Sequence, residues 1–247
     1  MKTSVVMAAY NSEATIGTAI ESFLAQDHPD KELIVIDGAS TDRTCEIVRG
    51  FDSPLIQLHS GPDKGIYDAM NKGLRRVSGE AFGCLNSDDR YHDAGVLGKL
   101  ARALQGADLV SGRLHFVREH GSAPVRVWQA DRHRPGAYAR GFTLPHPATY
   151  ARRAVLERVG DFSTDFRSAG DYDWLMRALE VEGFSHSVIE DVIVDMRIGG
   201  ESTGGAKAIL KNSREMLEIR RRRLGSGVVD AALFLNLFIK FKQVLLR

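Results

Sequence analysis

The fold is decided by the stretch ELIVIDGASTD, residues 32–42, in which a short apolar run passes directly into polar residues. The apolar part, residues 32–36, is rich in Ile, Leu and Val, which is typical of a buried strand. Asp37-Gly38 ends the run, and a helix is expected over residues 42–50. The stretch therefore predicts a strand followed at once by a helix.

The same alternation occurs on both sides of this stretch. Strands are expected at residues 4–10, 55–59 and 81–85, and helices at residues 16–24 and 65–77. Strands that alternate with helices form parallel sheets with right-handed crossovers. The sequence thus predicts an α/β fold, a mostly parallel, doubly wound sheet with helices on both faces. Such sheets bind ligands at the carboxyl ends of their strands.

The second half of the chain is expected to be less regular. A long loop is predicted over residues 131–145, which contain two prolines and several basic residues, and loops of that length are usually functional or mobile. The other predicted elements are a helix after Asp93, β-rich segments at 108–118 and 125–128, helices at 151–159 and 170–182, and strands near 184–189 and 192–198.

Composition excludes several classes of protein. The chain has 247 residues, 43% hydrophobic and 26% charged, enough apolar material for a sizeable core, so a disordered chain is excluded. The formal net charge is +1, which does not indicate nucleic-acid binding. Two isolated cysteines, Cys45 and Cys84, predict neither a disulfide framework nor a thiolate metal site and favour a reducing, cytoplasmic setting. No signal peptide or membrane span is predicted.

The last part of the chain differs from the rest in charge. Residues 206–247 carry ten basic and three acidic residues, a local charge of +7. A helix is expected over 206–224, ending in four arginines, and a second, amphipathic helix over 228–247. We therefore divide the chain into a domain of residues 1–205 and a basic amphipathic helical tail of residues 206–247. The tail is typical of a helix at an anionic membrane surface; packing on the domain, or across a homodimer, is the alternative.

Polar side chains follow three of the predicted strands. The first strand ends in Ala8-Ala9-Tyr10-Asn11, the second in the segment from Asp37 to Asp42, and the fourth in Asn86-Ser87-Asp88-Asp89. A carboxylate at a strand end can accept hydrogen bonds from a nucleotide base or ribose. Adjacent carboxylates can hold a hard cation against a diphosphate, because Mg²⁺ and Mn²⁺ prefer oxygen ligands. A turn with a helix cap is the alternative interpretation of Asp88-Asp89. The position of this pair directly after a buried strand favours the cation site instead.

These motifs together resemble a known family. The runs Val5 to Asn11, Val35 to Asp42 and Leu85 to Asp89 are similar to the signature of family 2 inverting glycosyltransferases with the GT-A fold. The stretch Asp63 to Gly73 is similar to a bacterial branch of that family that acts in polysaccharide and glycolipid assembly. The resemblance covers roughly residues 2–200.

The resemblance implies roles for individual residues. Asp37 would contact the nucleotide base, Asp88 the ribose, and Asp89 a Mn²⁺ or Mg²⁺ ion that bridges the donor diphosphate. Asn86 stands where the family often has an acidic residue, which leaves open how Asn86, Asp88 and Asp89 divide these tasks. The other expected donor contacts are Ala9, Tyr10, Asn11, Lys64, Ser87 and His146; for His146 a structural role is the alternative.

The same resemblance places the catalytic base at the start of a helix. Asp171 matches the carboxylate that removes the proton from the acceptor hydroxyl, which is too weak an acid to attack unaided. Gly170 replaces a Glu that often precedes it. Asp173 is interpreted as a cap or structural acceptor, and Trp174 either as the floor of an acceptor site or as core.

The sequence therefore predicts an inverting, metal-dependent glycosyltransferase. It would move a sugar from a nucleotide-diphosphate donor, with uridine diphosphate (UDP) implied by the resemblance, to a hydroxyl of a glycan or lipid-linked acceptor. It would act in the cytoplasm or peripherally on the inner face of the cell membrane. The alternatives are a non-catalytic nucleotide-sugar-binding or scaffold protein and a nicotinamide-dependent oxidoreductase. The oxidoreductase needs a glycine-rich fingerprint after the first strand, which this sequence lacks.

Overall fold

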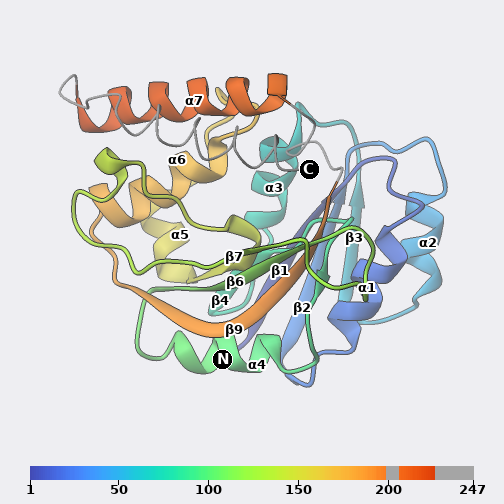
Figure 1. The fold of residues 1–247 in the computed structure, drawn as a ribbon. Coiled ribbons are helices and arrows are strands. Elements are labelled where there is room, and N and C mark those ends of the chain that lie inside the picture. The colour runs from blue at the N-terminus through green and yellow to red at the C-terminus, as the bar shows by residue number, and fades with distance from the viewer. Residues whose placement is uncertain (199–205, 226–247) are drawn as a thin grey trace.

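A computed structural model describes residues 1–198 and 206–225 of the chain. One sheet runs through the centre, with helices packed on both sides (Figure 1). The strand order is β3-β2-β1-β4-β8-β6-β9-β5, and β7 pairs with β6. The predicted α/β sheet with helices on both faces is confirmed.

The first half of the sheet is parallel. Its strands are β1 (Thr3–Ala9), β2 (Lys31–Asp37), β3 (Ile56–Ser60) and β4 (Ala81–Cys84). The helices between them are α1 (Ile16–Leu24), α2 (Thr44–Gly50) and α3 (Ile66–Leu74). Because these strands point the same way, the polar residues that follow β1, β2 and β4 lie at one edge of the sheet.

The second half of the sheet is mixed, and here the structure differs from the sequence prediction. Residues 149–152 form a strand, β8 (Thr149–Arg152), between β4 and β6, where the sequence predicts a helix from residue 151. Tyr150 is fully buried, and a Cβ at Gly83 of β4 would lie 2.4 Å from the Tyr150 ring. The strand therefore forms through close pairing with β4, which no local pattern of four residues reveals.

The remaining elements follow the prediction more closely, although the two strands predicted between residues 184 and 198 form one. They are β5 (Arg90–Tyr91), α4 (Val96–Ala103), β6 (Leu109–Val117), β7 (Arg126–Trp128), the 3₁₀ turns η1 (Tyr138–Arg140) and η2 (His146–Ala148), α5 (Arg153–Val159), α6 (Gly170–Met176), the π-helical turn η3 (Arg177–Val181), β9 (His186–Arg197) and α7 (Ala206–Leu224).

Alternation along β1 explains why both faces of the sheet are covered. Val5 and Met7 face a core formed with α1 and α4, whereas Val6 faces a second core formed with α3, α5 and α6. Successive side chains of a strand point to opposite faces, so an uninterrupted apolar strand needs helices on both sides. The two helix layers therefore enclose the sheet from both sides.

The helix α7 packs on the domain instead of projecting from it (Figure 1). Arg223 donates from Nε to Asp173 Oδ1 at 2.8 Å, and Arg222 donates to Asp165 at 3.3 Å. Arg220 is only 1% exposed. These arginines contact the protein, so in residues 206–225 the packed alternative holds. The predicted second tail helix lies outside the described residues, and its contact with a membrane or a second copy stays a prediction. None of the described helices is long and apolar enough to cross a membrane.

Candidate active site

Hydrogen bonds join the loops that follow β1, β2 and β4. Asn11 N–H donates to Ser40 Oγ at 2.8 Å, and Thr41 N–H donates to Asn11 Oδ1 at 2.9 Å. On the other side of the β1 loop, the hydroxyls of Ser12 and Ser87 are 2.9 Å apart. The three polar segments that the sequence singles out are therefore held together as one rim at the carboxyl edge of the sheet.

Two residues of this rim have unusual backbone conformations. Asn11 has a φ of 46° and Ala39 has a φ of 62°. Both lie in the left-handed backbone region, which residues other than glycine rarely adopt. Each such residue costs of order 1 kcal/mol or more, and such strain gathers at functional sites. The hydrogen bonds of Asn11 to Ser40 and Thr41 hold both loops in this shape.

Asp37 lies at the end of β2, entirely buried. Its Oδ2 accepts hydrogen bonds from Ser60 Oγ at 2.6 Å and from Ser40 N–H at 3.1 Å. Burial by itself raises the pKa of Asp37, but hydrogen bonds from Ser40, Ser60 and Cys45 outweigh burial and hold the pKa below its usual value. Asp37 is thus an ionised acceptor that these hydrogen bonds fix at the end of β2.

The Tyr10 ring lies near Gly38, the residue after Asp37, and is exposed. Its side chain is 64% exposed, an unusual state for a large aromatic residue next to a buried strand. A Cβ at Gly38 would lie 3.5 Å from the Tyr10 ring and 2.4 Å from Asp63 Oδ2. Glycine at this position therefore lets the loops after β1, β2 and β3 approach one another. Lys64, next in the chain, is exposed, and its N–H donates to Asp68 Oδ2 at 3.0 Å.

The two carboxylates after β4 differ in their surroundings. Asp89 is fully buried and accepts from Asn86 Nδ2 at 2.7 Å and from the Arg197 N–H at 3.1 Å. Burial, together with the charge of Asp88, raises the pKa of Asp89 to about 8. Asp88 is half-buried, and its carboxylate makes no hydrogen bond within residues 1–198 and 206–225. Asn86 therefore orients Asp89, while Asp88 presents free carboxylate oxygens at the rim.

Asp171 lies in the first turn of α6 and is anchored by a tyrosine. The Tyr67 hydroxyl, at the start of α3, donates to Asp171 Oδ1 at 2.9 Å. Burial and the Asp171 charge raise the pKa of Tyr67, so the phenol keeps its proton. Burial lowers the pKa of the His146 imidazole. The negative charge of Asp171 acts in the opposite direction but does not cancel the effect of burial. Since α3 starts at the carboxyl edge of the sheet, Asp171 lies at the same edge as the rim.

Gly170 stands where the resembling family often has a Glu, and the structure gives a steric reason for the glycine. A Cβ at Gly170 would lie 2.9 Å from the Tyr67 ring and 3.0 Å from the Ser163 carbonyl oxygen. Close packing of α6 on Tyr67 therefore leaves no room for the acidic residue that the resemblance leads us to expect. Asp173 is a structural acceptor, fully buried against Arg177 and Arg223, and Trp174 is core, 3% exposed with Nε1 donating to the Gly160 carbonyl.

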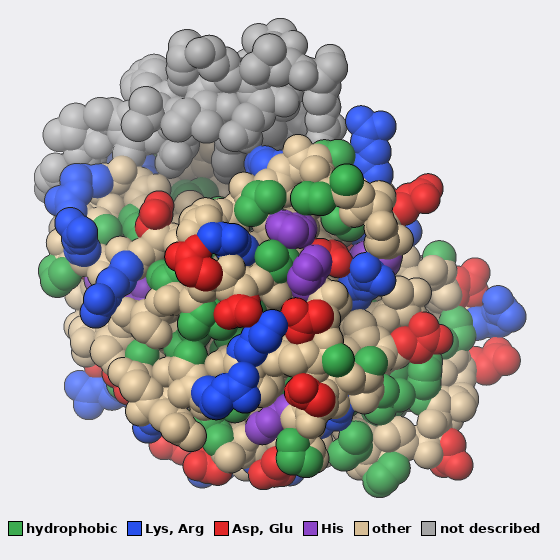
Figure 2. Space-filling model, turned by 60° about the horizontal axis from the view of Figure 1, so that its bottom comes forward, with side chains coloured by type: hydrophobic (Ala, Val, Ile, Leu, Met, Phe, Trp, Pro, Cys, Tyr) green, Lys and Arg blue, Asp and Glu red, His purple; other side chains and the backbone are tan. Residues whose placement is uncertain are grey.

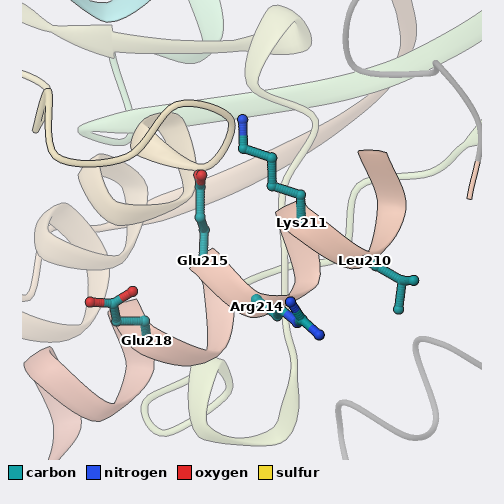
Figure 3. Close-up of a pocket in the computed structure, with 5 residues that line it drawn as sticks. All are labelled: Leu210, Lys211, Arg214, Glu215 and Glu218. Atoms are coloured by element: carbon teal, nitrogen blue, oxygen red, sulfur yellow. The ribbon is translucent and has the colours of Figure 1, made fainter. Parts of the chain in front are cut away.

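The helix α7 supports the opening of α6 through one glutamate. Glu215 Oε2 accepts from Ser168 N–H at 2.8 Å, Ser168 Oγ at 3.0 Å and Ala169 N–H at 3.1 Å. The Glu215 side chain extends from α7 toward the neighbouring loop, and it lines a surface hollow of about 320 Å³ on this helix (Figure 3). A carboxylate here satisfies backbone donors at the helix start, which have no partner inside the helix.

Glu215→Ala is expected to lower the free energy of unfolding by about 1–3 kcal/mol, because the amide of Ala169 loses its acceptor while buried. Chemical denaturation of the full chain measures this change. Glu218→Ala is the matched control: its carboxylate is 52% exposed and pairs with Arg222 one turn on, so its loss should cost less than about 1 kcal/mol. Equal losses in the two variants would contradict the supporting role of Glu215.

The structure reveals contacts of three residues that the sequence analysis does not predict. Tyr67 lies in the quoted stretch Asp63 to Gly73, but nothing local shows that its hydroxyl meets Asp171, 104 residues away. Glu215 lies in the segment assigned to the tail. His133 belongs to the predicted long loop; its side chain is 7% exposed and 3.1 Å from Glu180 Oε1. That contact fixes His133 inside the domain.

Comparison with known proteins bears directly on this site. Residues 4–170 match the family described as Glycosyl transferase family 2. A "PGL/p-HBAD biosynthesis glycosyltransferase" of Mycobacterium bovis is 27% identical over 196 residues, 75% of this chain and 74% of the relative. An uncharacterized glycosyltransferase of Mycobacterium tuberculosis is 30% identical over 183 residues, 71% of this chain and 68% of the relative.

Solved structures share the fold. S. aureus TarS 1–349 in complex with UDP-GlcNAc matches with a TM-score of 0.72 and 23% identity, over 96% of this chain and 70% of that chain. The mannosyltransferase PcManGT of Pyrobaculum calidifontis, in complex with GDP-Man and Mn²⁺, matches with a TM-score of 0.69 and 20% identity, over 96% and 69%. The chain spans 41% of a longer TarS structure.

The family match begins in β1 and ends at Gly170, so it contains the loops after β1, β2 and β4 and reaches the start of α6. It spans well over half of the chain, and the shared fold is of the GT-A type. Neither comparison favours an oxidoreductase or a scaffold protein. The chain belongs to glycosyl transferase family 2 and is a glycosyltransferase.

Proposed function

We propose that this glycosyltransferase moves a sugar, with inversion, from a nucleotide-diphosphate donor to a hydroxyl of a glycan or lipid-linked acceptor in cell-surface polysaccharide or glycolipid assembly. The observation that carries the proposal is the hydrogen-bonded rim that joins Asn11, Ser40 and Ser87, together with Asp171 at the same sheet edge. The donor class is supported by relatives in complex with UDP-GlcNAc and GDP-Man, and the glycolipid setting by the Mycobacterium bovis relative. UDP is our first choice of carrier.

The rim offers contacts for the nucleoside. Asp37 is ionised and can accept hydrogen bonds from N–H groups of the base, and the exposed Tyr10 ring offers a surface on which the base can stack. Ala9, Asn11 and Ser87 line the same rim through backbone and side-chain groups. Lys64, exposed at the start of α3, and His146 are the remaining donor contacts that we propose.

The carboxylates after β4 fit a divalent cation. Their oxygens are the ligands that Mn²⁺ and Mg²⁺ prefer, and PcManGT was solved with Mn²⁺. The free carboxylate of half-buried Asp88 favours this residue as the direct ligand, while Asn86 holds the buried Asp89 behind it. This assignment moves to Asp88 the metal-binding role that the resemblance implies for Asp89. A cation held there would offset the charge that develops on the leaving diphosphate.

Asp171 is the proposed general base. As the acceptor oxygen forms a bond to the anomeric carbon, the hydroxyl proton passes to Asp171, and the bond from that carbon to the diphosphate breaks. The Tyr67 hydroxyl holds one carboxylate oxygen at 2.9 Å and leaves the other for the acceptor. Attack from the side opposite the nucleotide inverts the configuration of the anomeric carbon.

A donor and acceptor panel tests the proposal. The full chain with Mn²⁺ is first screened against nucleotide sugars by thermal shift; a donor at about 100 times its Kd should stabilise the fold by about 2.7 kcal/mol. The selected donor is then incubated with glycan and lipid-linked acceptors, and NMR of the product gives the anomeric configuration. Donor binding without transfer to any acceptor would favour a non-catalytic binding protein, and retention would contradict the inverting mechanism.

A further inference from the structure

A second group of metal-ligating side chains lies outside the proposed donor site. His92 follows β5, His115 is on β6, and Asp195 is on β9; one ligand atom from each lies within 4.8 Å of the others. In the sheet, Asp195 is the register partner of His115 and also of Arg90, two residues before His92. The backbone of three neighbouring strands therefore sets the arrangement.

The distances suit a small cation. Asp195 Oδ1 lies 2.9 Å from His92 Nδ1 and 3.7 Å from His115 Nδ1. Two ligands about 2.05 Å from a tetrahedral zinc ion are roughly 3.3 Å apart. The two measured separations fall on either side of that value, so small side-chain rotations would bring all three atoms within bonding distance of one ion.

Among the described residues, Asp195 Oδ1 and the His115 ring have no hydrogen-bond partner outside the cluster. Arg90 Nε and Nη2 both donate to Asp195 Oδ2, which leaves Oδ1 to face the two imidazole rings. The His115 side chain is only 17% exposed, yet its ring makes no hydrogen bond to any residue that the structure describes. Burial, with the nearby His92, lowers the pKa of His115, so this imidazole is neutral at pH 7 and has a lone pair for a metal.

An ion can reach the cluster from solvent. His92 is 39% exposed, and with Arg90 it lines an open groove of about 300 Å³ beside α1. Histidine side chains lie among acidic and basic ones near the middle of the face shown in Figure 2. The groove therefore connects the His92 side of the cluster to solvent.

We propose that His92, His115 and Asp195 form a binding site for an imidazole-preferring divalent cation such as Zn²⁺, separate from the hard cation of the donor diphosphate. Two imidazole ligands select Zn²⁺ and similar ions over Mg²⁺ and Ca²⁺, which prefer oxygen ligands. When the ion binds, His92 Nδ1 gives up its hydrogen bond to Asp195 Oδ1, and the neutral ring carries its proton on Nε2. The ion links β5 to β6 and β9, and because β5 directly follows Asp88-Asp89, it fixes the end of the donor rim.

Cobalt binding to the full chain tests the site. Co²⁺ replaces Zn²⁺ with similar geometry, and its visible absorption distinguishes imidazole ligation from purely oxygen ligation. We expect one Co²⁺ with imidazole-type bands that Zn²⁺ displaces, and an affinity more than about 10-fold weaker in His92→Gln and His115→Ala. Asp89→Asn, which alters the other carboxylate pair, and His59→Gln, on β3 at the opposite end of the sheet order, should keep the bands.

Each outcome decides the proposal. Unchanged bands in both histidine variants, bands lost in Asp89→Asn alone, or no Co²⁺ binding by the wild type would each overturn it. His92→Gln guards against a folding defect, because His92 is 39% exposed and the substitution keeps a polar side chain. The result is independent of donor binding and sugar transfer, so failure of the proposed function would leave this test intact.

Discussion

The Asp171→Asn variant is expected to turn over roughly 10²- to 10⁴-fold more slowly than the wild type while it binds the nucleotide donor with unchanged affinity. Asparagine keeps the size of the side chain and the acceptor for the Tyr67 hydroxyl, but it cannot take a proton from the acceptor hydroxyl. The measurement is kcat for sugar transfer together with donor Kd from calorimetry, with the donor and acceptor that the panel identifies.

Asp165→Asn is the matched control for this variant. Asp165 is an exposed carboxylate shortly before α6, its side chain is 70% exposed, and its partner is Arg222. Its kcat should equal that of the wild type, because an exposed ion pair contributes little. Turnover near normal in Asp171→Asn would reject Asp171 as the base, and a large loss of donor affinity would move Asp171 into the donor site.

The second large effect is expected at the carboxylates after β4. Asp88→Asn should weaken the Mn²⁺-dependent part of nucleotide-diphosphate binding by at least about 10-fold, because it replaces the accessible anionic ligand by a neutral one. Calorimetry of UDP binding with and without Mn²⁺ separates that part from the binding that the base and ribose provide.

Two further variants make this experiment specific. Asp93→Asn removes a 45% exposed carboxylate that pairs with Lys99, and it should leave the metal dependence unchanged. Asp89→Asn tests the role that the resemblance implies for Asp89. If Asp89→Asn abolishes the metal dependence and Asp88→Asn preserves it, Asp89 is the direct ligand and our assignment of Asp88 is wrong.

The sequence predicts an element best when the signal for that element lies within a few neighbouring residues. The strands β1, β2 and β4 are short apolar runs that end in polar residues, so both their type and the edge at which their ligands gather follow from pattern alone. The family was recognised from the same runs and is confirmed. By contrast, β8 is a strand of four residues that forms by pairing with β4 and β6, and its own residues favoured a helix that the structure starts at Arg153.

Contacts between distant segments were not visible in the sequence. Tyr67 meets Asp171 across 104 residues, and Glu215 meets Ser168 across 47. The sequence leaves open whether the basic segment around Arg223 meets lipid or packs on protein, because charge alone does not reveal a buried partner. Asp173, the acid that accepts from Arg223, was recognisable only as a structural acceptor.

By itself, the sequence determined that this protein has an α/β sheet with the carboxylates Asp37, Asp88 and Asp89 at strand ends. The reason is that the period of apolar residues and the turn after each run are properties of neighbouring residues. Tertiary structure alone decided which carboxylate is free and which is enclosed, as for Asp88 and Asp89, and which segments hold Asp171 in place. The physical reason is that exposure, hydrogen-bond partners and pKa depend on what other parts of the chain pack against a side chain.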